Sequence, residues 1–155
     1  MADPINTRCD LMMFGALGDL AQRKLFPALY QLERAGLLHK GARILAIARN
    51  KADSSEVRKI LLGKLKEHVK KVEFDAEVAE QFLRRVDYQF LDFANPDGYG
   101  ALNDWRSTEP SNLIVYMATP PAMYGEISRN LRANNCCDHN TRGVVEKPAG
   151  HALGS

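Results

Sequence analysis

The sequence predicts a doubly wound α/β domain, with a parallel sheet of about five strands and helices on both of its faces. Two observations support this fold class. Short, continuous apolar runs recur along the chain, and stretches with the apolar spacing of a helix lie between them. Continuous apolar runs are typical of parallel strands buried on both faces, and right-handed helical crossovers join such strands. The predicted strands are Leu11–Phe14, Ile44–Ala48, Phe90–Leu91, Leu113–Ala118 and Val144–Val145.

Helices are predicted wherever a segment between strands presents a single apolar stripe. These stripes fall within residues 21–32, 57–65, 78–86 and 123–131. Asp53 with Glu56 three residues later resembles a capping box, and Asn95-Pro96 marks a further helix start. Gly36 is placed to close the first helix. Pro27 falls inside that helix, where it removes a backbone hydrogen bond, so we expect a kink or break just before it.

The composition is that of a packed, nearly neutral domain. The 155 residues include 21 Lys and Arg against 19 Asp and Glu, a formal charge of +2, and 45% are hydrophobic. Nucleic-acid binders usually carry a clustered basic face, whereas the basic residues here are scattered among acidic ones. No apolar stretch approaches the roughly 18 residues that span a membrane, and residues 1–7 do not resemble a signal peptide. We expect one soluble domain over residues 1–155, with a flexible N-terminus at 1–7 and neither nucleic acid nor membrane as partner.

The three cysteines favour a reducing, cytoplasmic location. Cys9, Cys136 and Cys137 are odd in number, and two are adjacent, a spacing that suits neither a disulfide nor a zinc site. No Cys-x-x-Cys motif or nearby His pair is present, so we expect no metal and assign the thiols no chemistry.

The first predicted strand ends in a glycine-containing turn that can hold a phosphate. The segment Gly15-Ala16-Leu17-Gly18-Asp19-Leu20-Ala21 leads from this strand into a helix. Gly15 permits a tight turn, Gly18 permits close approach of a pyrophosphate, and Ala21 lets the helix pack near the strand. A purely structural turn is the alternative. Asp19 would repel a pyrophosphate, so we expect it to favour the helix N-terminus or to anchor a basic side chain.

An arginine follows the second predicted strand, in the sequence Ala48-Arg49-Asn50. Sites selective for NAD place an acidic residue there for the ribose hydroxyls, whereas a guanidinium can pair with the 2′-phosphate of NADP. Arg49 therefore indicates NADP, with an ordinary surface arginine as the alternative.

Two more strand ends reach the same sheet edge, where open α/β sheets bind ligands. The fourth strand ends at Ala118-Thr119-Pro120-Pro121, where the prolines form a rigid lip before Tyr124. The fifth ends at Glu146-Lys147-Pro148, which places a lysine near both a cofactor and a substrate phosphate. Taken alone, each segment is more often structural.

Two segments together resemble one enzyme family. The stretch from Gly15 to Leu29, GALGDLAQRKLFPAL, is similar to the N-terminal fingerprint of glucose-6-phosphate dehydrogenases, and Glu146-Lys147-Pro148-Ala149-Gly150 resembles their second hallmark. The likeness runs from about Arg8 to the last residue. It implies a Rossmann-like NADP-binding domain of an enzyme that oxidises glucose 6-phosphate to 6-phosphogluconolactone in the oxidative pentose phosphate pathway. It also implies a homo-oligomeric parent enzyme.

The resemblance assigns a set of cofactor contacts. Those implied for NADP are Gly15, Ala16, Leu17, Gly18, Asp19, Leu20, Ala21, Gln22, Lys24, Arg49, Tyr124 and Lys147, with Leu91 and Asp92 near the adenosine. Lys147 is also implied to bind glucose 6-phosphate. Leu17, Gln22 and Ala149 differ from the residues common in the family.

No catalytic residue is expected within the chain. The family's catalytic His-Asp pair lies in a segment Arg-Ile-Asp-His-Tyr-Leu-Gly-Lys and a larger α+β domain, and neither occurs here. We therefore interpret the chain as the coenzyme domain of a longer enzyme. The alternatives are a stand-alone NADP-binding sensor and an α/β interaction domain with an empty site. A reading frame that continues into the Asp-His segment would favour the enzyme.

Overall fold

Five parallel strands form one sheet in the order β3-β2-β1-β4-β5. The computed structural model describes residues 8–108, 111–138 and 140–145. The strands are β1 (Cys9–Phe14), β2 (Ile44–Ala48), β3 (Val86–Phe90), β4 (Asn112–Met117) and β5 (Thr141–Val145). From β1 the chain moves outward first to β2 and β3, then to β4 and β5 on the other side. The doubly wound α/β fold expected from the sequence is confirmed.

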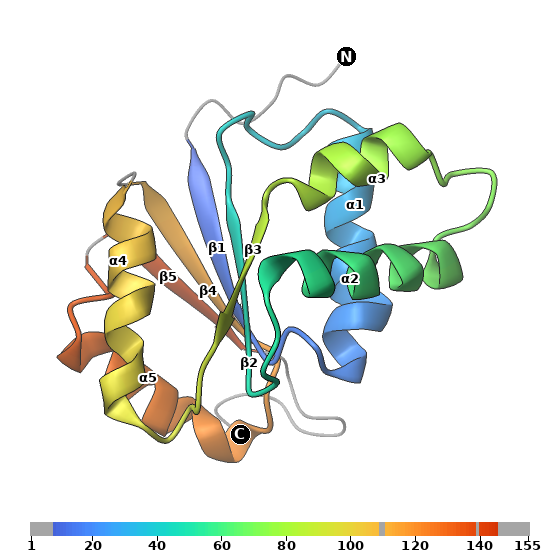
Figure 1. Cartoon of the computed structure of the whole chain (residues 1–155). Helices are drawn as coiled ribbons and strands as arrows, with labels where there is room; N and C mark the ends of the chain where they lie inside the picture. The colour runs from blue at the N-terminus through green and yellow to red at the C-terminus, as the bar shows by residue number, and fades with distance from the viewer. Residues whose placement is uncertain (1–7, 109–110, 139, 146–155) are drawn as a thin grey trace, which may run out of the picture.

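Helices cover the sheet from two sides (Figure 1). On one side lie α1 (Phe26–Arg34) with its π-helical first turn η1 (Ala21–Leu25), α2 (Ser54–His68) and α3 (Ala76–Leu83). On the other lie α4 (Gly100–Thr108) and α5 (Tyr124–Ala133), preceded by the short 3₁₀ helices η2 (Pro96–Tyr99) and η3 (Pro121–Met123). Right-handed crossovers require this division, because the chain reverses its direction across the sheet after β3.

Each face of the sheet has its own apolar core. The α1 side buries, among others, Met13, Ala21, Phe26, Tyr30 and Phe82. The α4 side buries Met12, Phe14, Tyr99, Leu113 and Ile127. Successive residues of β1 thus enter opposite cores, as the two-residue period of a strand demands, and β1 is the strand that both halves of the fold share.

The helix boundaries agree with their sequence signals. Asp53 and Glu56 form a capping box at the start of α2, and the Asn95 side chain caps η2. Gly36 closes α1 with a φ of +72°. The break expected before Pro27 is also present, because the N–H of Phe26 bonds to the carbonyl of Ala21, five residues back, in a π-helical turn. Proline has no N–H to continue the regular ladder there.

The prediction for β3 was wrong in its boundaries. The strand covers Val86–Phe90 rather than Phe90–Leu91, and Val86 belongs to it and not to the preceding helix, which ends at Leu83. In this segment buried Val86 and Tyr88 alternate with more exposed Asp87 and Gln89. Buried and exposed residues alternate in this way in an edge strand with one solvent-facing side. The prediction assumed instead that every strand is a continuous apolar run.

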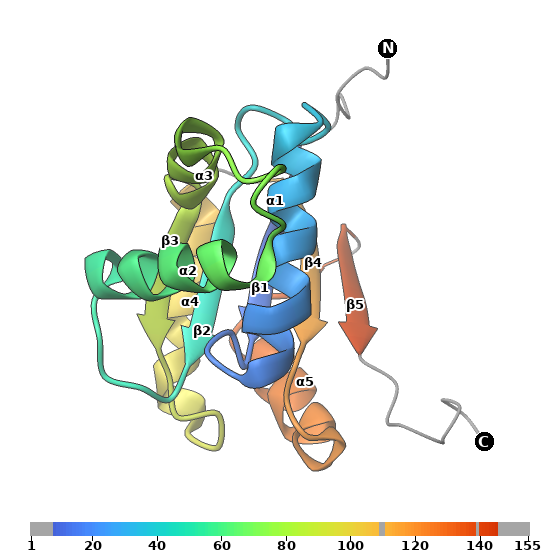
Figure 2. The ribbon, with the colours of Figure 1, turned by 90° about the vertical axis from the view of Figure 1, so that its right-hand side faces the viewer.

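Coverage on both faces is incomplete over β4. Leu113, Val115 and Met117 are buried on the α4 side, whereas Ile114 and Tyr116 remain partly exposed on the α1 side. Figure 2 shows β5 at the edge of the sheet next to β4, with no described helix in front of it. The crossovers that lead to β4 and β5 both lie on the opposite face, so no described helix packs over the α1 side of β5.

A buried ion cluster joins the amino ends of the strands. Asp10 is fully buried and accepts from Arg8 at 2.7 Å and from Nη2 of Arg43 at 2.8 Å. Arg43 also donates to the carbonyl of Trp105 and stacks over its ring, with Cζ 4.1 Å from the centroid. Burial alone would raise the pKa of Asp10, but hydrogen bonds from Arg8, Arg43 and Ser111 outweigh it and lower the pKa below 3.8. The cluster links β1, β2 and α4.

The ion cluster predicts an acid-sensitive stability. Because the folded-state pKa of Asp10 is lowered, its contribution is complete above the ordinary value of 3.8 and is lost as the pH falls through the folded-state pKa. Asp10→Asn should lower the free energy of unfolding by about 3 kcal/mol at neutral pH, and the difference from the wild type should shrink in acid. Urea titrations at several pH values measure this.

The exposed Asp97 supplies the matched control. Asp97→Asn should change the free energy of unfolding by less than about 0.5 kcal/mol. Equal effects of the two substitutions would show that the cluster does not stabilise the fold.

Candidate functional site

The order of the strands defines a crevice at the carboxyl end of β1. There the chain turns towards β2 on one side, while β4 lies on the other. In open α/β sheets this point of reversal is where ligands bind, outside the carboxyl ends of the strands. The turn after β1 and the segments after β2, β3 and β4 all reach this edge, which brings together most of the site residues expected from the sequence.

Gly15 occupies the tightest position in the crevice. Its φ is +81°, a conformation that residues with a side chain rarely adopt. A Cβ placed on Gly15 would lie 2.5 Å from the carbonyl oxygen of Ala118, at the end of β4. The N–H groups of Gly15 and Ala16 both donate to the carbonyl of Ile47, at 2.9 and 3.1 Å. The turn is therefore fixed against both neighbouring strands, as its glycine predicted.

The helix that follows the turn directs backbone N–H groups at the crevice. The N–H of Gln22 donates to the carbonyl of Gly18 at 3.1 Å and begins the helical ladder. By helix geometry, the N–H groups of residues 19–21 precede the first such bond and are available to an anion. Ala21 is fully buried, which allows the close packing of helix and strand that its size predicted.

The polar side chains Asp19 and Gln22 bind to groups of the turn itself and of the helix that follows it. Asp19 pairs with Arg23 at 2.9 Å, which confirms that it anchors a basic side chain. The Gln22 side chain donates to the carbonyl of Leu17 at 3.0 Å and closes the turn. Lys24 is exposed on the following turn of helix. The backbone, more than these side chains, is arranged for a phosphate.

Arg49 stands exposed at the carboxyl end of β2. It forms no ion pair with the part of the chain that the structure describes. The nearest acidic residue in sequence, Asp53, accepts from the N–H of Glu56 at 2.8 Å and so caps α2. The hydroxyl of Tyr88 donates to the carbonyl of Asn50 at 2.5 Å and fixes the backbone beside Arg49. No local sequence pattern predicts this last contact, because 38 residues separate Tyr88 from Asn50.

Leu91 and Asp92 follow β3 at the same edge. The N–H of Leu91 donates to the carbonyl of Ala48 at 2.9 Å, which joins this segment to the end of β2. The Leu91 side chain is 2% exposed, so only its backbone can face a ligand. Asp92 is exposed, and its Oδ1 accepts from the N–H of Ala94 at 3.1 Å.

The segment after β4 forms the other wall of the crevice. The N–H of Ala118 donates to the carbonyl of Phe14 at 2.9 Å, and that of Met123 to the carbonyl of Pro120 at 3.0 Å. Thr119, between these bonds, carries a buried hydroxyl with no hydrogen-bond partner. Tyr124 is half-buried and packs against the α4-side core. Lys147 and the rest of its hallmark segment, like residues 1–7, lie outside the described residues.

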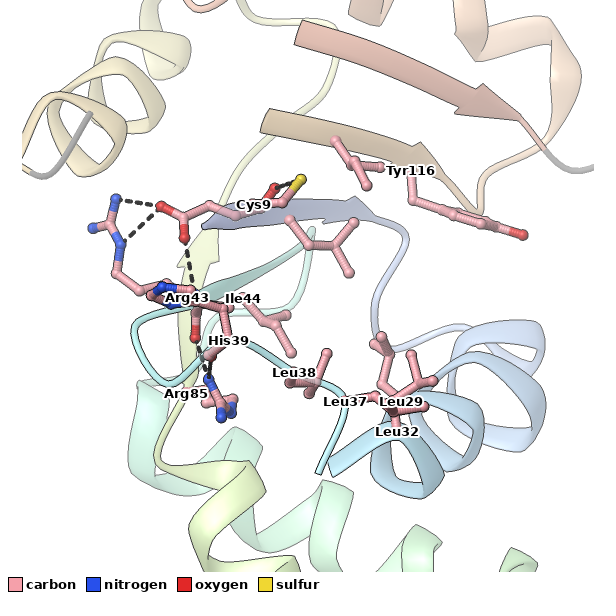
Figure 3. A pocket seen from close by; sticks show the side chains of 14 residues that line it. Cys9, Leu29, Leu32, Leu37, Leu38, His39, Arg43, Ile44, Arg85 and Tyr116 are labelled. Carbon is pink, nitrogen blue, oxygen red and sulfur yellow. Dashed lines mark hydrogen bonds and ion pairs between the residues drawn. The ribbon is translucent and has the colours of Figure 1, made fainter. Parts of the chain in front are cut away.

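An apolar pocket of about 360 Å³ lies near the amino ends of the strands, away from the crevice (Figure 3). Its lining includes Leu29, Leu32, Leu37, Leu38 and Ile44 on one side and Cys9 and Tyr116 on the other. Arg43 and Arg85 border it, but Arg43 pairs with Asp10 and Arg85 donates to Glu33 at 2.6 Å. Both cations are therefore neutralised by carboxylates and are not available to an anionic ligand in this pocket.

The remaining features of the described residues concern metal ligation, membrane-spanning helices and the cysteine thiols. Within the described residues, no three His, Cys, Asp or Glu side chains are grouped to hold a metal ion, and no helix there is long and apolar enough to cross a membrane. Burial raises the pKa of the Cys136 thiol to about 11, and the pKa values of Cys9 and Cys137 are also raised by burial. The thiols therefore stay protonated at neutral pH.

Comparison with known proteins identifies the family. Residues 12–155 match the family model described as "Glucose-6-phosphate dehydrogenase, NAD binding domain". The chain belongs to the glucose-6-phosphate dehydrogenase family. Its sequence is 34% identical over 152 residues to the glucose-6-phosphate 1-dehydrogenase of Mycolicibacterium smegmatis and 36% identical over 147 residues to that of Dickeya dadantii. Each alignment covers 95% of this chain.

Solved structures of the family share the fold. The crystal structure of the glucose-6-phosphate 1-dehydrogenase from Mycobacterium avium superposes with a TM-score of 0.84 at 27% identity, over 94% of this chain and 31% of that one. A family member in complex with its substrate glucose 6-phosphate gives a TM-score of 0.78 at 28% identity, over 97% of this chain and 32% of that one. The chain spans 31% and 30% of the lengths of the M. smegmatis and D. dadantii relatives.

Substitution of Gly15 should test how tightly the crevice is built. Gly15→Ala combines a positive φ with a contact of 2.5 Å to a backbone oxygen, so it should lower the free energy of unfolding by about 2 to 4 kcal/mol. Gly36→Ala has a similar φ, but no atom lies within 4 Å of its added Cβ. It should therefore show only the cost of the backbone conformation, about 1 kcal/mol. Urea denaturation compares the two variants, and equal losses would contradict a close packing at Gly15.

Proposed function

We propose that this chain is the NADP-binding domain of a glucose 6-phosphate 1-dehydrogenase. In this role it holds NADP in the crevice at the end of β1, while the enzyme oxidises glucose 6-phosphate to 6-phosphogluconolactone. Membership of the family and the crevice geometry support the binding of a nicotinamide dinucleotide. The preference for NADP is the finer proposal, and Arg49 is the observation that carries it.

The charges around Arg49 favour a 2′-phosphate over a free ribose hydroxyl. Arg49 is exposed and its cation has no acidic partner among the described residues, while Asp53 is engaged in capping α2. A guanidinium can bind a phosphate through two parallel hydrogen bonds. The residue that directly follows β2 is therefore a cation and not the carboxylate that an NAD-selective site places there.

The chain's own residues would bind and orient the cofactor. The N–H groups of residues 19–21 face the pyrophosphate, Gly15 and Gly18 give it room, and Arg49 holds the adenosine end. Bound NADP would supply the acceptor for the hydride from C1 of the sugar, and the proton of the C1 hydroxyl would pass to a base. The resemblance assigns that base to a domain outside this chain and assigns Lys147 a contact with the sugar phosphate. A homo-oligomeric assembly is proposed from the same resemblance, and a cytoplasmic location is proposed from the three unpaired cysteines.

Arg49→Ala should weaken NADP selectively. The loss of one charge-assisted contact, about 1.5 to 3 kcal/mol, corresponds to roughly a ten- to hundredfold higher Kd for NADP. The Kd for NAD, which lacks the 2′-phosphate, should change by less than about threefold. Calorimetric titration of both cofactors measures the two constants.

Arg84→Ala is the matched control, because Arg84 is exposed and precedes β3 at the opposite end of the sheet. It should leave both constants unchanged. If Arg49→Ala weakens NADP and NAD equally, the assignment of Arg49 to the 2′-phosphate is wrong.

A sensor that binds NADP without catalysis is the second candidate, and activity separates the two. The 155-residue chain is expected to bind NADP weakly and to give no NADPH with glucose 6-phosphate, since hydride transfer needs a positioned sugar and a base. NADPH absorbance follows the reaction. Sustained turnover above a mock preparation would place the base within this chain and contradict our interpretation. A parent chain that continues into the family's Asp-His segment and its larger α+β domain should be active, whereas a sensor would remain inactive.

A further inference from the structure

Thr119, at the wall of the crevice, has a buried hydroxyl that forms no hydrogen bond. Among the side chains that the structure describes, its Oγ1 is the one buried polar atom without a hydrogen-bond partner. Buried hydroxyls in native proteins nearly always have such a partner, because an unpaired one loses its hydration without compensation. The backbone on both sides is held by the bonds of Ala118 to Phe14 and of Met123 to Pro120. The side chain is therefore the part of this segment that can move.

A rotation about χ1 would turn the hydroxyl towards the phosphate turn. The Thr119 methyl carbon Cγ2 faces that turn, 3.1 Å from the point where a Cβ on Gly15 would lie. Hydroxyl and methyl are attached to the same Cβ and exchange places between staggered rotamers. In one alternative rotamer the hydroxyl would occupy the position of Cγ2, beside the space that Gly15 leaves open.

The strand order assigns Thr119 to one half of the dinucleotide. Arg49 follows β2 and Thr119 follows β4, on opposite sides of the turn at the end of β1. A dinucleotide lies across such a crevice with its pyrophosphate at the turn and one mononucleotide half on each side. If the 2′-phosphate of the adenosine half is at Arg49, Thr119 faces the nicotinamide-bearing half.

We propose that the Thr119 hydroxyl turns from its buried position and donates a hydrogen bond to an oxygen of the nicotinamide-bearing half of NADP. The inference rests on the proposed cofactor and adds a residue that orients its reactive end. In the free protein the hydroxyl is buried without a hydrogen-bond partner, and in the complex it gains the partner it lacks.

Thr119→Val tests the hydroxyl with little change of shape. The methyl group that replaces Oγ1 needs no hydrogen-bond partner. The Tm of the free variant should therefore equal or exceed that of the free wild type. The Kd for NADP should rise by about three- to tenfold, the value of one neutral hydrogen bond. Thr119→Ser keeps the hydroxyl and should bind NADP within about twofold of the wild type. A general loss of packing would instead lower the Tm together with the affinity.

Adenosine 2′,5′-bisphosphate is the probe that separates the two halves. It carries the 2′-phosphate for Arg49 but lacks the nicotinamide-bearing half, so Thr119→Val should bind it as the wild type does, while Arg49→Ala should bind it more weakly. Unchanged NADP affinity in Thr119→Val, or an equal loss for NADP and the bisphosphate, would overturn the Thr119 proposal alone. If the wild type binds neither ligand, the proposed cofactor is wrong and the inference falls with it.

Discussion

The contact between Gly15 and the end of β4 is the constraint on which the crevice depends. A carbonyl oxygen lies 2.5 Å from where a side chain would begin, so the chain can pass here only as glycine. The same turn bonds to β2 through Ile47. Three strand ends are thereby fixed around one point, and the helix that follows is directed at the crevice with its N-terminal N–H groups leading. The geometry that we propose for phosphate binding is therefore a consequence of how the sheet is joined at its centre.

Charge is distributed differently at the two ends of the sheet. At the amino ends, Arg43 pairs with buried Asp10 and Arg85 with Glu33, so these cations stabilise the fold and are not available to a ligand. At the carboxyl ends, Arg49 is exposed, and the cation of Lys51 lies 5.9 Å from the Phe90 ring. Arg49 is therefore the exposed cation to which our proposal assigns the 2′-phosphate of the cofactor. The apolar pocket lies near the neutralised end, consistent with a role in packing and not in cofactor chemistry.

Much of this arrangement could be predicted from local sequence, and the exceptions have physical reasons. Strands β1, β2 and β4 are continuous apolar runs, and the turn, the capping box and the closing glycine are local signals. Strand β3 was misplaced because an edge strand alternates in polarity. Asp10 and Arg43 lie 33 residues apart in sequence, so no local pattern predicts that they pair. The unpaired hydroxyl of Thr119 likewise depends on the atoms that surround it, which only the folded chain brings together.

The central claim is that NADP binds at the crevice formed by the ends of β1, β2, β3 and β4. A titration followed by two-dimensional amide NMR of the 155-residue chain tests it residue by residue. Addition of NADP should shift the amide signals of residues 15–22, 48–50, 91–92 and 118–124, and leave those of residues 37–44, beside the apolar pocket, almost unchanged. Shifts concentrated at residues 37–44, with the glycine turn unaffected, would contradict the account.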